Sequence, residues 1–123
     1  MLHKGLPRAC RLHLERDFER IIKGGHKVQG QGLVMWTAEN SNSVQSARFA
    51  VVVSKQLGPA VVRNRTKRLL REAFRNSKTQ LKLGVDIIVR PNSSEKLINV
   101  QAAQEALTSL YRKAGLLGSS AQS

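Results

Sequence analysis

The residues of this chain that are best suited to chemistry are the cations of one short segment. Residues 61–75, VVRNRTKRLLREAFR, hold six of the 21 lysine and arginine residues and a single acid, Glu72. A guanidinium group binds a phosphate through two parallel hydrogen bonds and also stacks on bases. If the segment is helical, five of these cations fall within about 140° of arc, which predicts a contact with RNA or DNA. The cations of this arc and the amide among them are Arg63, Asn64, Lys67, Arg68, Arg71 and Arg75.

The same chain offers little for breaking a bond. Two-metal phosphodiester chemistry needs several carboxylates that converge on one point. The one acidic cluster, Glu15, Asp17 and Glu19, fans around a helix and is interpreted as a solvated helix start that the helix dipole favours. The three histidines lack the spacing of metal ligands. The glycines of residues 29–33 neither follow a predicted strand nor precede a predicted helix, which argues against a phosphate-binding loop. We therefore predict no catalytic residue and no metal ligand.

Composition also indicates a polyanionic partner. Lysine and arginine outnumber the acids by 21 to 8, which gives a net charge of +13. Because charge of this size destabilises a compact chain, we expect it to serve a partner, nucleic acid before an anionic membrane. No apolar stretch approaches the roughly 20 residues of a membrane-spanning helix. The N-terminus does not resemble a secretory signal, and the single Cys10 is compatible with a reducing cytosol. A cytoplasmic protein is expected.

The first half of the chain is predicted to form a helix followed by strands. Residues 1–13 are basic and aperiodic, which indicates an irregular arm. Apolar spacings of three and four predict a short helix over residues 15–23 that two glycines end. Residues 27–38 are predicted to form one strand. Residues 46–54 are nearly continuous in apolar character and predict a central strand that is covered on both faces.

The second half is predicted to alternate helix and strand. The basic helix opens at Gly58-Pro59 and should end near Asn76-Ser77. A buried strand is predicted over residues 85–90. The last helix is expected between residues 99 and 115, because asparagine is a good N-cap and glycine a common C-terminal stop. The tail, residues 116–123, is predicted to be flexible.

These elements predict one domain over residues 1–123 of the α+β class, a two-layer α/β sandwich. The order is helix, strand, strand, helix, strand, helix. The strand at 46–54, the basic helix and the strand at 85–90 form a βαβ-like unit.

The few aromatic side chains divide between core and surface. Phe49 and Phe74 fit core positions in their strand and helix. Trp36 suits core packing and a stacking surface for an unpaired base equally well, and Phe18 is similarly open.

One long spaced pattern resembles the signature of the bacterial ribonuclease P protein subunit. The pattern is Lys55-x-x-Gly58-x-Ala60-Val61-x-Arg63-Asn64-x-x-Lys67-Arg68-x-x-Arg71-Glu72-x-x-Arg75. The resemblance covers most of the chain, from about Leu6 to Leu117. It implies a central, mostly antiparallel sheet of about four strands and a left-handed βαβ crossover that carries the basic helix. The fourth strand would come from splitting residues 27–39 or from the segment that follows.

The resemblance also implies an activity. The ribonuclease P family forms a ribonucleoprotein that removes the 5′ leader from precursor tRNA. The RNA subunit is the ribozyme and holds the catalytic Mg²⁺. The protein binds that RNA and the leader, so the implied partners are the ribonuclease P RNA and the precursor leader, with no obligate protein partner.

Site residues follow from the matching positions. The residues that would face the ribozyme are Arg63, Asn64, Lys67, Arg68 and Arg71, with Lys55, Arg65 and Arg75 as auxiliary contacts.

The family's leader-binding cleft lies between the first helix and the sheet, at positions that match Phe18, Ile22 and Trp36. Many members have an aromatic residue where this chain has Ile22, so apolar contact is expected there in place of stacking. Trp36 falls where the family often has an aromatic residue, which favours its stacking role.

Two other classes remain open from the residues alone. A structural ribosomal or RNA-chaperone protein would bind ribosomal RNA, and its depletion would leave leader processing unaffected. A duplex DNA binder would insert the basic helix into the major groove, but the short helix and tight turn that usually precede a recognition helix are missing.

Overall fold

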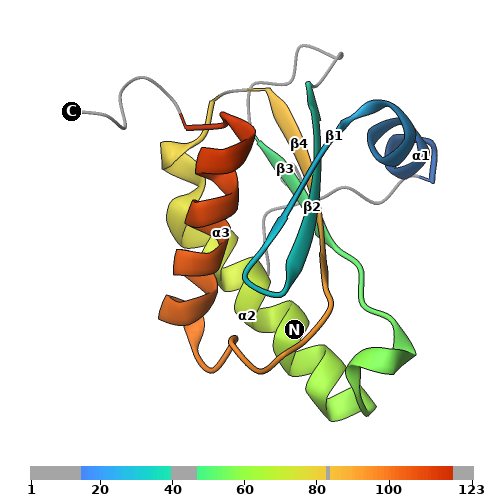
Figure 1. Ribbon diagram of the computed structural model, residues 1–123, viewed down its shortest axis with the longest axis vertical. Helices are drawn as coiled ribbons and strands as arrows, with labels where there is room; N and C mark the ends of the chain where they lie inside the picture. Colours follow the sequence, from blue (N-terminus) through green and yellow to red (C-terminus); the bar gives the residue numbers. More distant parts are fainter. Residues whose placement is uncertain (1–14, 40–46, 83, 118–123) are drawn as a thin grey trace, which may run out of the picture.

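The computed structural model describes residues 15–39, 47–82 and 84–117 of the 123-residue chain (Figure 1). The predicted basic arm and most of the predicted tail lie outside these residues. No helix in the described ranges is long and apolar enough to cross a membrane. In chain order the described elements are α1 (Glu15–Gly24), β1 (His26–Gly30), β2 (Leu33–Glu39), β3 (Arg48–Val51), the 3₁₀ turn η2 (Lys55–Leu57), α2 (Ala60–Ser77), the 3₁₀ turn η3 (Lys78–Gln80), β4 (Val85–Pro91) and α3 (Val100–Ala114).

The described strands form one mixed sheet in the order β1-β2-β4-β3. The β1–β2 and β2–β4 pairs are antiparallel and the β3–β4 pair is parallel. The predicted α+β class with a mostly antiparallel sheet is therefore confirmed. Helix α2 connects β3 to its parallel neighbour β4, as the predicted βαβ unit requires. The left-handed sense of this crossover stays a prediction.

The fourth strand arises because the single strand predicted over residues 27–38 is a hairpin of β1 and β2. Gln31 and Gly32 form its turn with φ values of 56° and 76°. Two successive positive φ angles are what a tight two-residue hairpin turn needs. Gly30 ends β1, so the prediction that no strand precedes these glycines is wrong. The segment that follows is β2, and of these glycines only Gly32 belongs to the turn.

Strand β3 lies at an edge of the sheet that the described residues form, so the prediction of a central strand over 46–54 is wrong. Strand β4 is central, between β2 and β3. Both faces of β3 are nevertheless covered. Phe49 stacks on Phe74 of α2 with ring centroids 4.4 Å apart, and Ala50 packs in the cluster of Ile21 from α1. Burial on both faces makes an edge strand look like a central one in the sequence.

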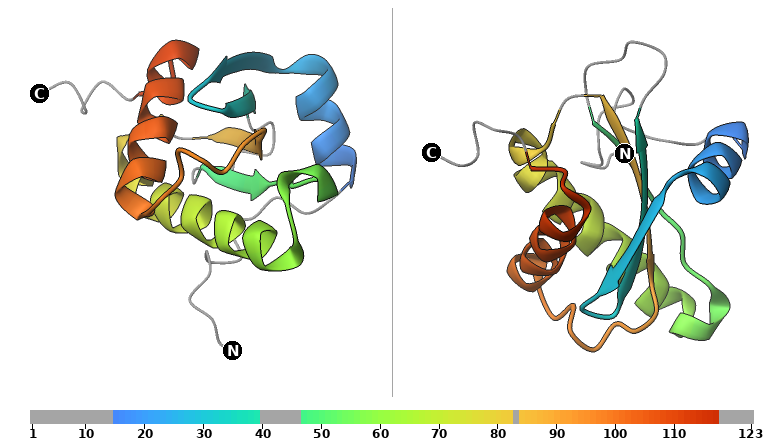
Figure 2. Two further views of the ribbon diagram at one scale, coloured as in Figure 1. Left: turned by 60° about the horizontal axis from the view of Figure 1, so that its bottom comes forward. Right: turned by 45° about the horizontal axis from the view of Figure 1, so that its top comes forward.

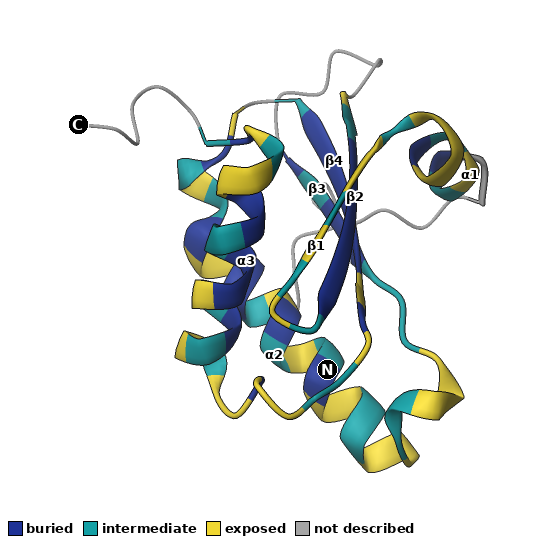
Figure 3. Cartoon of the chain, in the orientation of Figure 1, coloured by how far each residue is buried: buried dark blue, intermediate teal, exposed yellow. Residues whose placement is uncertain are grey.

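Helices cover both faces of the sheet, as the two views in Figure 2 show. Helices α2 and α3 pack together on one face and enclose the main core there, whereas α1 is the described helix that covers the other face. Figure 3 shows β2 and β4 buried along most of their length, because side chains on both of their faces meet helices. The α1 face holds a smaller cluster of Ile21, Val34, Trp36, Ala50 and Ile88.

Both predicted ends of α3 are confirmed. Asn99 accepts a hydrogen bond from a backbone N–H of the first turn at 2.8 Å, and Gly115 ends the helix with a φ of 71°. The chain stays packed for two residues beyond the predicted end. Leu116 is buried and its carbonyl accepts a hydrogen bond from the N–H of Lys82, while Leu117 forms a β-bridge. The flexible tail was therefore predicted to begin too early.

Candidate RNA interface

The outer side of α2 carries the basic residues of segment 61–75 that the sequence predicts for an RNA contact. Arg65 is the one cation of residues 61–75 that lies outside the predicted arc of about 140°. It is nevertheless exposed, next to the cations of that arc. Arg63 and Lys67 are half-buried, so they form one margin of the surface. The centre of the exposed side therefore lies nearer Arg68 than the centre of the arc predicted from helical periodicity. The exposed polar residues of this side are Asn64, Arg65, Arg68, Arg71, Arg75 and Asn76.

The opposite side of α2 fixes the orientation of the basic side. Leu70, Ala73 and Phe74 are fully buried in the main core. Two polar residues share this buried side, Thr66 and Ser77, and each hydroxyl donates to a backbone carbonyl one turn earlier at 2.8 Å. Such bonds remove the penalty of burying a hydroxyl. The helix therefore cannot rotate about its axis without exposing Leu70, Ala73 and Phe74 to solvent.

Several arginines of α2 also bond to the protein itself. Arg63 donates from Nη1 to the Gly58 carbonyl at 3.1 Å, and Arg65 donates from Nη2 to the Ile98 carbonyl at 2.8 Å. Arg75 forms an ion pair with the one acid of the helix. A guanidinium has five N–H donors, so each of these contacts orients the group and leaves donors for a phosphate. Arg65 also ties α2 to the segment that precedes α3.

Lys55 is exposed on the turn η2, which packs beside α2. Its carbonyl accepts a hydrogen bond from the N–H of Gly58 at 3.2 Å. Gly58 has a φ of 150°, a conformation that other residues rarely adopt, and a Cβ there would lie 3.3 Å from the Cβ of Val62. Glycine thus permits the sharp turn that holds Lys55 near the start of the basic helix.

A second candidate surface lies on the other face of the sheet, where α1 packs. Phe18 is half-buried and packs against the cluster that contains Trp36. The structure thus brings these two predicted leader-binding residues together. Ile22 is 42% exposed and lies outside that cluster. Trp36 is only 8% exposed, so most of its surface is already in contact with the protein.

Two cations that the sequence analysis missed flank Trp36. The Lys27 ammonium lies 5.8 Å and the Arg90 guanidinium carbon 5.3 Å from the centre of the indole ring. Lys27 pairs directly with Trp36 across the β1–β2 hairpin, whereas Arg90 pairs with Val34, which lies two residues before Trp36 on the same face of β2. Both distances suit a cation–π contact. Strand alternation from Trp36 would have placed these cations on its face, had the hairpin and the strand order been known.

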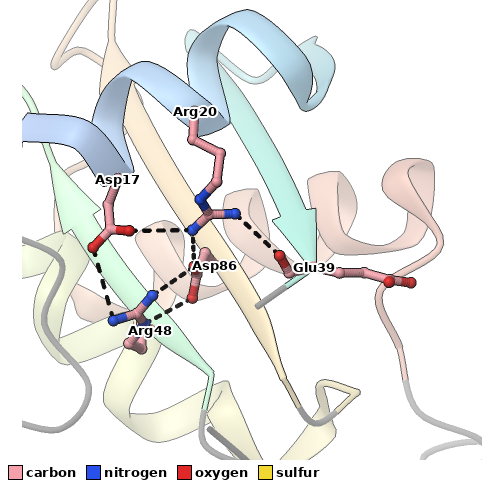
Figure 4. Close-up of polar contacts among 5 residues, drawn as sticks. All are labelled: Asp17, Arg20, Glu39, Arg48 and Asp86. Carbon is pink, nitrogen blue, oxygen red and sulfur yellow. Dashed lines mark hydrogen bonds and ion pairs between the residues drawn. The ribbon is translucent and has the colours of Figure 1, made fainter. Parts of the chain in front are cut away.

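Below α1, a network of two acids and two arginines joins three elements (Figure 4). Asp86 of β4 is fully buried. Arg48 of β3 donates to its two carboxylate oxygens from Nε and Nη2, each at 2.9 Å. Arg20 of α1 donates to Oδ2 of Asp86 at 2.7 Å. Asp17 of α1 completes the network, 3.4 Å from Arg20 and 3.9 Å from Arg48.

This network corrects the interpretation of Asp17 as part of a solvated helix start. Asp17 is buried and faces the sheet, because α1 rests on that side. Glu19 does lie on the surface, where it pairs with Lys23. The hydrogen bond to Asp86 raises the pKa of the Arg48 guanidinium above its usual value, so Arg48 stays charged. The network is an ionic anchor for α1, a role that no motif in the sequence marks.

Within the part of the chain that the structure describes, no three His, Cys, Asp or Glu side chains gather as metal ligands would. His26 is exposed on β1. His3, His13 and Cys10 lie outside the described residues.

Comparison with known proteins agrees with the fold. A protein-family model described as Ribonuclease P matches residues 6–115. The ribonuclease P protein component of Staphylococcus aureus is 37% identical over 102 residues, which are 83% of this chain and 86% of that protein. A solved structure of the S. aureus ribonuclease P protein matches with a TM-score of 0.77 at 34% identity, over 90% of this chain and 100% of that one. The Thermotoga maritima protein matches with a TM-score of 0.72 at 33% identity, over 84% and 96% of the two chains. The chain belongs to the ribonuclease P protein family.

Proposed function

We propose that this member of the ribonuclease P family binds the catalytic RNA and the 5′ leader of precursor tRNA, and so assists the RNA in endonucleolytic removal of the leader. The observation that carries the proposal is the exposed basic side of α2, which the buried side of the same helix holds in a fixed direction. Its cations suit an RNA backbone, and the curated relatives are named as ribonuclease P protein components.

The ribozyme contact is assigned to α2 and the turn before it. Arginine guanidinium groups bind phosphate oxygens in pairs of hydrogen bonds, and Asn64 adds an amide that can reach a base or the backbone. If about six cations each neutralise one phosphate, the logarithm of the binding constant falls against the logarithm of salt with a slope of about −4 to −5. The proposed contact residues are Lys55, Arg63, Asn64, Arg65, Lys67, Arg68, Arg71 and Arg75.

The leader contact is assigned to the α1 face of the sheet. Single-stranded RNA is bound where aromatic rings and cations lie side by side, because bases stack and phosphates need neutralising. Phe18 and Trp36 supply the rings, and Lys27 and Arg90 supply the charge. Since both cations flank the indole, a base that stacks on Trp36 takes the place of one of them, which is then free to bind a phosphate. Ile22 supplies exposed apolar surface on the same helix.

The bond-breaking step is assigned to the RNA subunit. The catalytic Mg²⁺ would be held mainly by RNA, and it would activate the water and stabilise the leaving oxygen. The carboxylates that are buried among the described residues, Asp17 and Asp86, are engaged by arginines, so they are poorly suited to hold a metal. The contribution of the protein is positive charge near two RNA strands, which should lower the magnesium that cleavage demands. We expect this to take place in the cytoplasm and without an obligate protein partner.

Reconstitution with a bacterial ribonuclease P RNA at low magnesium tests the proposal. Cleavage of precursor tRNA should be faster with the protein than without it. A double variant of the basic side, Arg68→Gln with Arg71→Gln, should lose most of this gain. A matched variant, Lys82→Gln with Arg112→Gln, removes the same charge from exposed positions outside α2 and should keep it. Cleavage that is no faster with the protein would contradict the proposal, and equal losses in both variants would contradict the assignment to α2.

A further inference from the structure

Helix α1 has little apolar contact with which to hold its position. It spans ten residues, a length at which an isolated helix is unstable in water. Among its described side chains Ile21 is fully buried, Phe18 is half-buried and Ile22 is 42% exposed. Contacts of other kinds must therefore contribute to the placement of this helix on the sheet.

Arg20 makes polar contacts that connect α1 to two strands of the sheet. It donates to the Asp86 carboxylate of β4 at 2.7 Å and to the Glu39 carbonyl at the end of β2 at 3.1 Å (Figure 4). Arg48 holds the same carboxylate from β3 with two hydrogen bonds. Since the Asp86 side chain is fully buried and doubly bound by Arg48, it offers Arg20 a fixed point. A planar guanidinium held at two acceptors fixes direction as well as distance.

The Asp86 carboxylate lies next to the surface that contains Trp36. Asp86 and Ile88 project on the same face of β4, and Ile88 pairs with Trp36 across the sheet. Phe18, two residues before Arg20, packs on this same cluster. A shift of α1 at Arg20 would therefore change the spacing between Phe18 and Trp36, which are the two rings of the proposed leader site.

We propose that Arg20 and Asp86 are positioning residues that set the spacing between α1 and the sheet for the RNA leader. This inference rests on the proposed leader contact, and it gives the ion pair a role in substrate preference beyond holding the fold. Neither residue needs to touch RNA for this role. The ribozyme contact is assigned to the opposite face of the sheet, so it should not depend on the ion pair.

Two variants separate positioning from direct electrostatics, because they change the charge in opposite directions. Arg20→Met removes a positive charge and leaves the Asp86–Arg48 pair in place. Asp86→Asn removes a negative charge, so electrostatics alone would tighten RNA binding. Positioning predicts that both variants weaken the preference for leader-bearing RNA. Lys23→Met is the matched control, since it removes a positive charge from the same helix at a surface pair with Glu19.

The experiment uses the reconstituted holoenzyme and compares its affinity for precursor tRNA with its affinity for mature tRNA. We expect Arg20→Met and Asp86→Asn to lose about tenfold of the leader-dependent gain, less than the roughly hundredfold that a misplacement of about 1 Å can cost in catalysis. Binding of the catalytic RNA should stay at the wild-type level, whereas general unfolding would weaken both. Arg20→Met should also leave the salt slope unchanged, because a lost phosphate contact would flatten it by about 0.7.

Trp36 provides an independent measurement, because it is the only tryptophan of the chain. Its emission should change in free Arg20→Met protein and stay as in the wild type in Lys23→Met. A wild-type emission spectrum together with a retained leader preference in Arg20→Met would overturn the inference, and so would equal losses in Lys23→Met. A wild-type holoenzyme with no leader preference would instead overturn the proposed leader contact, and the inference with it.

Discussion

Arg68 lies in the middle of the exposed side of α2, while Arg63 and Lys67 are half-buried at its margin. The cations of α2 therefore differ in how much of their side chain is accessible to RNA. Arg63 and Arg65 each give one donor to a backbone carbonyl, so their reach is restricted. The residues at the centre of the exposed side are expected to contribute most of the salt-dependent affinity.

Arg68→Ala should weaken binding of the catalytic RNA and flatten the salt slope by about one unit, because one phosphate contact is lost. The measurement is the RNA binding constant over a series of salt concentrations. Arg112→Ala, an exposed arginine of α3, is the control and should leave the slope unchanged. An unchanged slope for Arg68→Ala would remove Arg68 from the phosphate contact.

The sequence predicted which side of α2 is exposed well and the contacts of the α1 face poorly, for a physical reason. Helical periodicity places Arg68 and Phe74 on opposite sides of α2 without any knowledge of the rest of the fold. Lys27 and Arg90 flank Trp36 only through strand pairing. Arg20 meets Asp86, 66 residues further along the chain, only because α1 packs on that part of the sheet. Such pairings require the strand order, which no local pattern contains.

At the scale of elements, α1 and β2 meet through a glycine. An ideal Cβ at Gly25 would lie 2.4 Å from the backbone oxygens of both Ile21 and Thr37. These are main-chain atoms of a helix and of a strand, so neither can move aside without disturbing its element. The two glycines were predicted as a helix stop, and the structure adds that only the second one is crowded.

Gly25→Ala should therefore destabilise the protein by about 1–3 kcal/mol, the usual result of overpacking. Gly24→Ala is a stringent control, because a Cβ at Gly24 meets nothing within 4 Å. Urea unfolding of both variants measures the difference in unfolding free energy. Equal unfolding free energies of the two variants would contradict the prediction, because they would show that α1 and β2 can move apart to accept a Cβ at Gly25 at little cost.

At the scale of the whole molecule, the main core contains one titratable side chain whose ionisation opposes folding. Burial raises the pKa of the Tyr111 hydroxyl above its usual value, and its hydrogen bond with Ser77, at 3.0 Å, offsets this in part. The neutral form is therefore favoured in the folded protein. Tyrosine in the unfolded chain loses its proton near pH 10, as a rough reference. The stability that this difference provides is complete below that pH and is lost as the pH rises towards the folded pKa.

Tyr111→Phe should cost about 1 kcal/mol at pH 7, the value of a typical hydrogen bond. Above about pH 10 the wild type should lose up to roughly 1.4 kcal/mol per pH unit more than the variant, since only the wild type can ionise there. Unfolding free energies of both proteins from pH 7 to 11 measure this. Parallel curves above pH 10 would contradict the assignment.

The sheet separates the two proposed RNA surfaces, with α2 on one face and α1 with Trp36 on the other. A hydrogen-bonded sheet resists compression and bending far more than a loop does. The fold therefore sets the distance between the proposed ribozyme contact and the proposed leader contact, which is about the thickness of the sheet and the helix packed on it. If the two proposed contacts hold, the sheet acts as a spacer: with α2 bound to the catalytic RNA, only a leader nucleotide at one fixed distance would reach Trp36.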